Sequence, residues 1–119
     1  MNTTNQPSSN DIIIDRYILL SIKHGEATEN GNSNNANSAY KELESVFKKI
    51  VQSGNRERLV PLLDHGNPAV RAKAAFHTYV LDPHRAIAVL KGVASCPGLI
   101  GFCADMVLKQ IRSGELMPN

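Results

Sequence analysis

Four histidines are the side chains of this sequence that most readily bind a metal: His24, His65, His77 and His84. Helical metal sites commonly place two histidines four residues apart or use a C-x-x-C pair. None of the histidine pairs has that spacing, and the sequence contains neither an H-E-x-x-H nor a C-x-x-C motif. We therefore expect no metal site and no cofactor, and we expect His77 to be a packed or half-exposed residue rather than a ligand.

Cys96 is the candidate for a nucleophile, because it follows Ser95 at an expected helix start, where the helix dipole lowers a thiol pKa. Catalysis by a cysteine also requires a histidine base and an orienting carboxylate. His84 and Asp105 are the available candidates, but the sequence does not place them beside the thiol. No glycine-rich phosphate loop is present. We therefore expect Ser95 to cap the helix, Cys96 to pack, and the protein not to be an enzyme.

The two cysteines also bear on the compartment. Cys96 and Cys103 are separated by two helical turns, about 10 Å, which is too far for a disulfide within one helix. Free, buried thiols in a reducing environment fit best. The sequence lacks an apolar run long enough to span a membrane, and its first ten residues lack the basic region of a secretion signal. The sequence therefore predicts a cytoplasmic protein without a membrane partner.

Charge gives little support for a nucleic-acid partner, because the net charge is only +2. Basic residues are scattered around the middle of the chain: Arg56, Arg58, Arg71, Lys73 and Arg85. Acidic residues intervene and no aromatic residues alternate with them, so nucleic-acid binding is disfavoured. Asp64 and Arg71 fit a structural role, since an acidic residue in a helix–helix turn stabilises the next helix start or bonds an arginine.

Composition and helix-boundary residues predict a single all-α domain. Apolar residues make up 42% of the 119 residues but aromatic residues only 5%. Small aliphatic side chains must therefore fill the core, which suits helix packed on helix. Three expected helices begin with a proline in the first turn, at Pro68, Pro83 and Pro97, where the missing N–H is no loss. Gly54 is expected to end the helix before residue 55, and Gly114 the helix that begins at Pro97.

Apolar periodicity places about six helices. The first runs from about residue 10 to about residue 23 or 29, and the others lie at approximately 40–53, 55–63, 68–81, 83–93 and 97–113. Residues 1–9 are expected to be a disordered lead, residues 30–38 a loop or the frayed start of a helix, and residues 10–119 one helical domain. The predicted core includes Leu62, Leu63, Val70 and Leu90. On the last helix, the residues expected to face inward are Leu99, Ile100, Cys103, Met106, Val107 and Ile111.

An internal parallel suggests stacked helical hairpins. Residues 59–63 match residues 86–90 at an offset of 27, and one such hairpin cannot bury its apolar face alone. The block L-V-P-L-L-D-H-G-N-P-A-V-R-A-K-A-A…D-P-H-R-A-I-A-V-L resembles HEAT-type hairpins. With the closing I-G-F-C-A-D-M-V-L-K-Q-I-R-S-G-E-L, the chain from Ala39 onward is similar to a small bacterial family of HEAT-like domains of uncharacterised function. This resemblance implies a surface for binding other macromolecules.

In size and composition the chain also resembles immunity proteins of bacterial contact-dependent growth-inhibition systems. That resemblance implies a cognate toxin domain as partner, blocked by occlusion of its active site. A nuclease toxin has a basic cleft, which an acidic patch would complement. The candidate partner-binding residues are the acidic residues expected to be exposed: Glu42, Glu44 and Asp105, with Glu26 and Glu29 near the loop. A helical-repeat scaffold or adaptor without a toxin partner, and a nucleic-acid-binding helical repeat, remain the alternatives.

Overall fold

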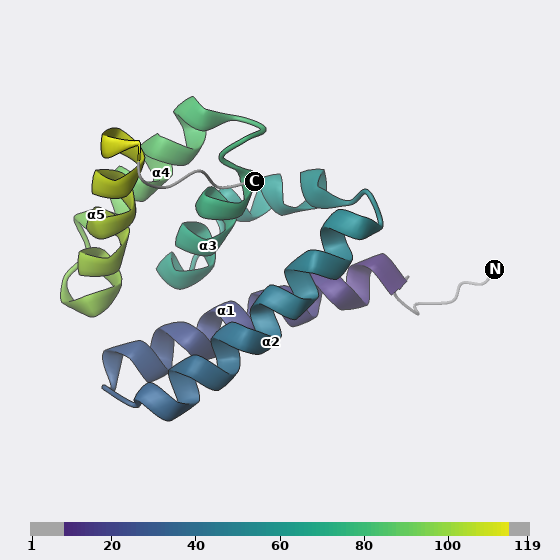
Figure 1. Cartoon of the computed structure of the whole chain (residues 1–119), viewed down its shortest axis with the longest axis horizontal. Helices are drawn as coiled ribbons and strands as arrows, with labels where there is room; N and C mark the ends of the chain where they lie inside the picture. The colour runs from purple at the N-terminus through teal and green to yellow at the C-terminus, as the bar shows by residue number, and fades with distance from the viewer. Residues whose placement is uncertain (1–8, 115–119) are drawn as a thin grey trace.

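The computed structural model describes residues 9–114, and this range contains helices and short links without a strand (Figure 1). The elements are α1 (Ser9–Glu29), α2 (Ser33–Gln52), the 3-10 helix η1 (Arg56–Asp64), α3 (Pro68–Thr78), α4 (Pro83–Ala94) and α5 (Gly98–Ser113). The expected all-α fold of six helices is confirmed. The lead expected over residues 1–9 lies, apart from Ser9, outside the described residues. No helix in the described range is long and apolar enough to cross a membrane.

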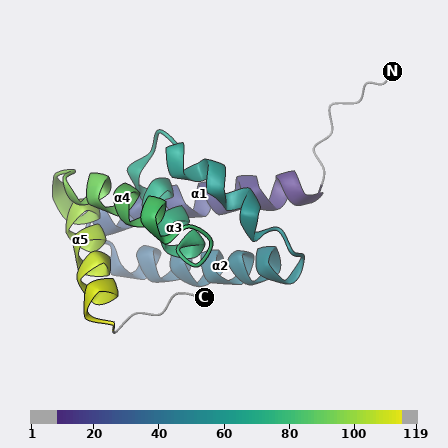
Figure 2. The same ribbon diagram turned by 90° about the horizontal axis from the view of Figure 1, so that it is seen from above.

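The helices pair in chain order as three hairpins, α1 with α2, η1 with α3, and α4 with α5. Figures 1 and 2 show the long α1–α2 hairpin along one side of the molecule, with α5 at the opposite end from the start of α1. The central helix is α3, which also contacts α1, α4 and α5. The offset between residues 59–63 and 86–90 therefore reflects the first helices of two successive hairpins.

Side-chain caps explain two of the helix starts. The Asn67 carboxamide oxygen accepts a hydrogen bond from the backbone N–H of Ala69 at 2.8 Å, immediately before α3. The Asp82 carboxylate accepts one from the backbone N–H of Arg85 at 3.2 Å, immediately before α4. Each cap satisfies a backbone donor that has no partner inside its helix. The predicted starts of these two helices are therefore confirmed.

The cap expected at the last helix is wrong. Ser95 ends α4 rather than starting α5, and its hydroxyl donates to the backbone carbonyl of Gly92 at 2.6 Å. Pro97 is the N-cap residue of α5, and it lacks a side chain that could accept a hydrogen bond. At the far end, Gly114 stops α5 with a positive φ of 78°, as expected.

The segment 30–38 is mostly helix rather than loop. Helix α2 begins at Ser33, because the Asn32 side chain accepts a hydrogen bond from the backbone N–H of Asn35 at 3.0 Å. The link between α1 and α2 shrinks to residues 30–32, with Gly31 at a φ of 70°. Asparagine favours both turns and helix caps, so a run of asparagines does not distinguish the two by composition.

The core lies between the hairpins and matches the predicted set. Leu62, Leu63, Val70 and Leu90 are all buried. Helices α1 and α3 approach each other closely at Gly25, where an added Cβ would lie 2.6 Å from the Cβ of Ala69. Because no larger residue fits there, Gly25 sets the distance between the first hairpin and the centre of the stack.

The inward face expected for α5 is partly wrong. Its buried residues are the small Gly101 and Ala104, with Leu108 one turn later. Three of the expected inward residues are exposed instead, namely Leu99 at 43%, Met106 at 44% and Cys103. The neighbouring Phe102 is 60% exposed. Apolar residues occur around most of this helix, so periodicity alone did not identify the packed side. The packed side carries a glycine at position 101 because an added Cβ there would lie 1.9 Å from the carbonyl oxygen of Cys96.

Candidate functional site

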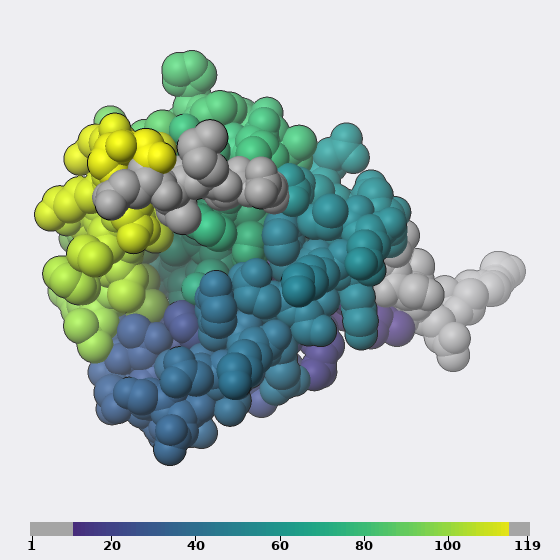
Figure 3. Space-filling view, in the orientation of Figure 1, coloured from purple at the N-terminus to yellow at the C-terminus, as the bar shows by residue number. Residues whose placement is uncertain are grey.

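A cavity of about 260 Å³ lies between the first hairpin, α3 and α5. Figure 3 shows the molecule hollowed between α5 and the α1–α2 hairpin. Most of its wall is apolar, and the larger side chains that form this wall include Tyr40, Phe76, Ile100 and Val107. We call this space the α3–α5 cavity. Its lining combines titratable side chains from several helices with this apolar wall, and we therefore take it as the candidate site.

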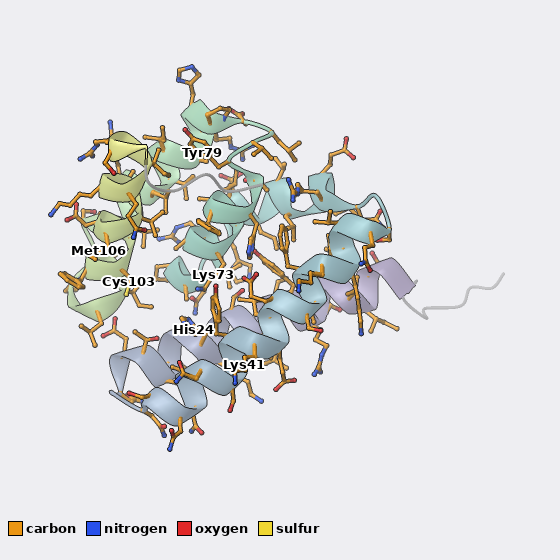
Figure 4. All side chains as sticks on the ribbon, in the orientation of Figure 1. His24, Lys41, Lys73, Tyr79, Cys103 and Met106 are labelled. Carbon is orange, nitrogen blue, oxygen red and sulfur yellow. The ribbon has the colours of Figure 1, made fainter. Side chains whose placement is uncertain are left out.

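Lys73 extends from α3 into the wall of this cavity, and Figure 4 shows it with His24 of α1 and Cys103 of α5 around the same space. Its ammonium lies 5.3 Å from the centre of the Tyr40 ring, within range of a cation–π contact. Burial lowers the pKa of Lys73, although Glu44 and Cys103 act in the opposite direction. Among the described residues, no hydrogen bond or ion pair is made by its amino group.

His24 is the second titratable group at the cavity, and it is uncharged at neutral pH. Burial, reinforced by the nearby Lys73 charge, lowers the pKa of His24 to about 4. Its ring centre lies 5.8 Å from that of Tyr40. The lysine and the histidine therefore share one aromatic neighbour, and the Lys73 charge disfavours the charged form of His24.

A chain of three polar side chains runs from the core to the cavity wall. The Tyr17 hydroxyl lies 2.7 Å from His77 Nδ1, and His77 Nε2 lies 3.4 Å from a Glu44 carboxylate oxygen. The Glu44 carboxylate can only accept, so Nε2 carries the histidine proton and Nδ1 accepts from the tyrosine. The chain therefore links α1, α3 and α2, with all its donors pointing toward Glu44. The Phe47 ring stacks on His77 at a centroid distance of 3.8 Å.

The pKa shifts agree with this assignment. Burial raises the pKa of Tyr17 and lowers that of His77, which keeps both groups neutral. The hydrogen bond from His77 lowers the pKa of Glu44, which keeps the carboxylate ionised. Tyr17 is 0% exposed, so its hydroxyl does not reach a substrate. The chain holds three helices together, and of the two alternatives expected for His77 the structure shows the packed one.

The acidic residues predicted to bind a partner fall into two groups. Glu26 and Glu42 line a groove between α1 and α2, where Glu42 also pairs with Arg16 at 2.7 Å. The other three surround α5: Glu29, Glu44 and Asp105. We therefore find no single patch among the five residues, and their role in partner binding stays a prediction.

The three residues around α5 differ in their contacts. The Glu29 carboxylate accepts hydrogen bonds from the backbone N–H groups of Leu99 and Ile100, at 3.1 and 2.8 Å, and so caps α5 from the end of α1. Asp105 pairs with Lys109 at 3.0 Å. Glu44 is half-buried beside His77, so the expectation that it is exposed is wrong.

Most of the basic residues around the middle of the chain have structural partners. Arg85 pairs with Asp64 at 2.8 Å, and Arg71 donates to the backbone carbonyls of His65 and Gly66. The structural role expected for Asp64 and Arg71 is therefore confirmed. Arg58 pairs with Asp11, and the Arg56 guanidinium lies 5.1 Å from the centre of the Phe47 ring.

Sequence reasoning grouped Lys73 with these arginines and so missed its position in the cavity. The available signal was its sequence context, since Lys73 is flanked by alanines that pack α3 into the stack.

The cysteines are free, but they are not buried. Cys96 is partly exposed and Cys103 is exposed, which corrects the expectation of buried thiols. Cys103 lines the α3–α5 cavity and is open to solvent, so it marks the mouth of the cavity. Within residues 9–114, no group of three histidine, cysteine or acidic side chains is arranged to hold a metal ion.

Comparison with known proteins identifies a family. The family model described as "Domain of unknown function (DUF2019)" matches residues 11–111. The chain is also similar to the crystal structure of the protein RPA1889 from Rhodopseudomonas palustris CGA009, with a TM-score of 0.78, 18% sequence identity and 100% coverage of both chains. At that identity the likeness shows the fold alone. No curated protein matches the sequence. Because the family model covers most of its length, the chain belongs to the DUF2019 family.

Proposed function

We propose that this protein is a non-catalytic protein-binding module whose docking surface is the outer side of α5. The observation that carries the proposal is the apolar surface formed by Leu99, Phe102, Cys103 and Met106, which we call the α5 face. Their spacing of three and four residues places them on one side of the helix. Exposed apolar clusters with an aromatic residue at the centre are typical of protein-binding sites.

Acidic residues border the α5 face and favour a basic partner. Asp105 lies on the same helix, Glu29 caps its first turn, and Glu44 lines the adjoining cavity. An apolar centre with a charged rim is the usual organisation of a protein interface. The rim charges would steer a basic partner toward this end of the stack and set its orientation.

The most specific form of the proposal is an immunity protein that binds a cognate bacterial toxin domain and occludes its active site. Its support is the resemblance in size and composition to such proteins, together with the acidic border of the α5 face. A nuclease toxin fits best, because its phosphate-binding cleft is basic. A partner bound through the α5 face would leave the buried contacts of the first hairpin unchanged.

Co-expression tests this proposal. A toxin domain encoded next to this protein is produced in cells, and survival is compared with and without this protein. We expect the protein to rescue growth and Phe102→Glu to abolish the rescue. Ile12→Glu is the matched control, because Ile12 is 56% exposed at the start of α1, at the other end of the molecule. An acidic residue in a first helical turn is also well tolerated.

Charge reversal separates the two acidic groups. Asp105→Lys, beside the α5 face, should weaken the complex, whereas Glu42→Lys, in the α1–α2 groove, makes the same charge change elsewhere. If Glu42→Lys weakens the complex more than Asp105→Lys does, the docking surface lies on the first hairpin instead. If the toxin domain is harmless, or stays lethal while the folded protein is abundant, the immunity form is wrong and an adaptor role replaces it.

A further inference from the structure

The α3–α5 cavity has the size of a small-molecule site. Its volume is about 260 Å³. An apolar protein cavity of roughly 150 Å³ holds benzene, and common ligand pockets start near about 300 Å³. By that scale the cavity accommodates a ligand of about ten non-hydrogen atoms, more than benzene and less than most drugs.

The cavity presents one cation to such a ligand. Lys73 is largely buried by the cavity wall, and its ammonium lies 5.3 Å from the centre of the Tyr40 ring. It makes no ion pair with a carboxylate of the described residues, although the Glu44 charge is close enough to favour its charged form. A buried charge without a hydrogen-bond partner destabilises the folded protein. Among the described residues, the one carboxylate that lines the cavity belongs to Glu44, which already accepts from His77. An anionic ligand would therefore supply the partner that the described chain does not.

The distribution of polar groups selects a carboxylate with an apolar tail. A phosphate is usually held by several cationic or backbone donors, but Lys73 is the only lysine or arginine among the described lining residues. The neutral donors of this lining include Tyr40, Gln110 and a Thr28 hydroxyl that already donates to the backbone carbonyl of His24. A carboxylate needs fewer donors. On the α5 side of Lys73 the wall is formed by Ile100, Val107 and Ala104, which suit an alkyl chain. Repulsion from Glu44 on the α2 side would favour the same placement.

We propose that the α3–α5 cavity binds a small amphiphilic carboxylate, with the carboxylate on the Lys73 amino group and the alkyl tail against α5. This site adjoins the α5 face at Cys103, but it does not depend on the docking of a protein there. Cys103, at the mouth of the cavity, would be covered when the ligand is bound.

Calorimetric titration with three probes tests the proposal. Octanoate has ten non-hydrogen atoms and a negative charge, octanol has a similar chain without charge, and inorganic phosphate has charge without a chain. We expect octanoate to bind one-to-one and phosphate not to bind. Lys73→Met should weaken octanoate binding roughly ten- to a hundredfold, the usual loss of a charge-assisted hydrogen bond, and leave octanol binding nearly unchanged.

Lys109→Met is the matched control, because it removes the same charge from exposed Lys109 on α5. It should leave octanoate binding within about twofold, since it alters only a screened surface pair. Equal weakening by both variants would show that octanoate is attracted by net charge alone, and would overturn the site. Binding of neither octanoate nor octanol would overturn it as well.

Thiol protection in the unaltered protein gives a second measurement that does not depend on a variant folding. The alkylation rates of Cys103 and Cys96 by iodoacetamide are followed separately by mass spectrometry. Octanoate should slow the reaction at Cys103 and not at Cys96, which lies outside the α3–α5 cavity. Equal rates with and without saturating octanoate, or equal protection of both cysteines, would contradict the proposal.

Discussion

Polar side chains are paired with one another at the junction of α1, α2 and α3, whereas apolar side chains are exposed to solvent on the outer side of α5. At the junction, Tyr17, His77 and Glu44 form one hydrogen-bonded chain, and Phe47 stacks on the histidine. On α5, Phe102 is 60% exposed beside other apolar residues. Substitutions at the junction should therefore change the free energy of unfolding. Substitutions on the outer side of α5 should instead change the surface that a partner would contact.

The largest expected effect is the loss of a core leucine. Leu63→Ala or Leu90→Ala should lower the free energy of unfolding by about 2–5 kcal/mol, because each residue is at most 1% exposed and its removal leaves a cavity. Urea unfolding followed by circular dichroism measures the change. Losses below about 0.5 kcal/mol at both positions, the size expected for surface substitutions, would show that the hairpin interfaces are assigned wrongly.

A smaller loss should follow from breaking the polar chain at the junction. Tyr17→Phe removes the donor to His77 Nδ1 and leaves a buried acceptor unsatisfied, at a cost of about 1–3 kcal/mol. Tyr79→Phe is the matched control, since Tyr79 is partly exposed and makes no side-chain hydrogen bond among the described residues. The same denaturation experiment applies to both variants. Equal effects would mean that the Tyr17–His77 hydrogen bond contributes nothing to stability.

Acid should destabilise the protein through groups at the same junction and cavity. The pKa of His24 falls from its ordinary 6.5 to about 4 on folding, so the unfolded chain binds more protons between these values. The contribution of neutral His24 to the free energy of unfolding is therefore fully present above about pH 6.5 and is lost as the pH falls toward 4. The lowered pKa of His77 acts in the same direction, and the lowered pKa of Glu44 adds a loss below its ordinary 4.5.

Melting temperatures measured from pH 7 to pH 4 check this expectation. His24→Asn should make the decline shallower, because the variant lacks one of the groups that take up a proton on unfolding. His84→Asn is the control at an exposed histidine on α4. A decline that is identical in all three proteins would exclude His24 as a contributor.

The smallest effect on stability is expected on the α5 face. Phe102→Glu should change the free energy of unfolding by less than about 0.5 kcal/mol, because the ring is already exposed. This insensitivity is what makes the variant useful in the rescue assay, where the loss of binding should be large. A loss above about 2 kcal/mol would place Phe102 in the core and remove the contrast between the two regions.

Much of the fold was predictable because the residues that start and end helices act locally. Proline at positions 68 and 83 and glycine at 114 act through their own backbone geometry, and the structure confirms the boundaries they indicate. The start of α2 was left open between a loop and the frayed start of a helix, because asparagine favours turns and caps equally well. Leucine burial in the two later hairpins followed from apolar spacing.

The site was less predictable because it depends on contacts between distant segments. The position of Lys73 in a cavity requires that α1, α2 and α5 converge on α3, and no local pattern encodes that convergence. The outward turn of Phe102 depends on the close approach at Gly101, which an apolar helix sequence does not reveal. The acidic residues were predicted from their charge and expected exposure, and neither property distinguishes the cap at Glu29 from the ion pair at Glu42.

The cap that Glu29 places on α5 also has a kinetic consequence. It joins residues that are 70 and 71 positions apart, so it can form only after the intervening hairpins have assembled. The backbone amides of Leu99 and Ile100 therefore report the docking of the last hairpin onto the first. In native-state hydrogen exchange, their protection should be lost in a partial opening of α4 and α5 at lower free energy than global unfolding, while the amides of α3 stay closed.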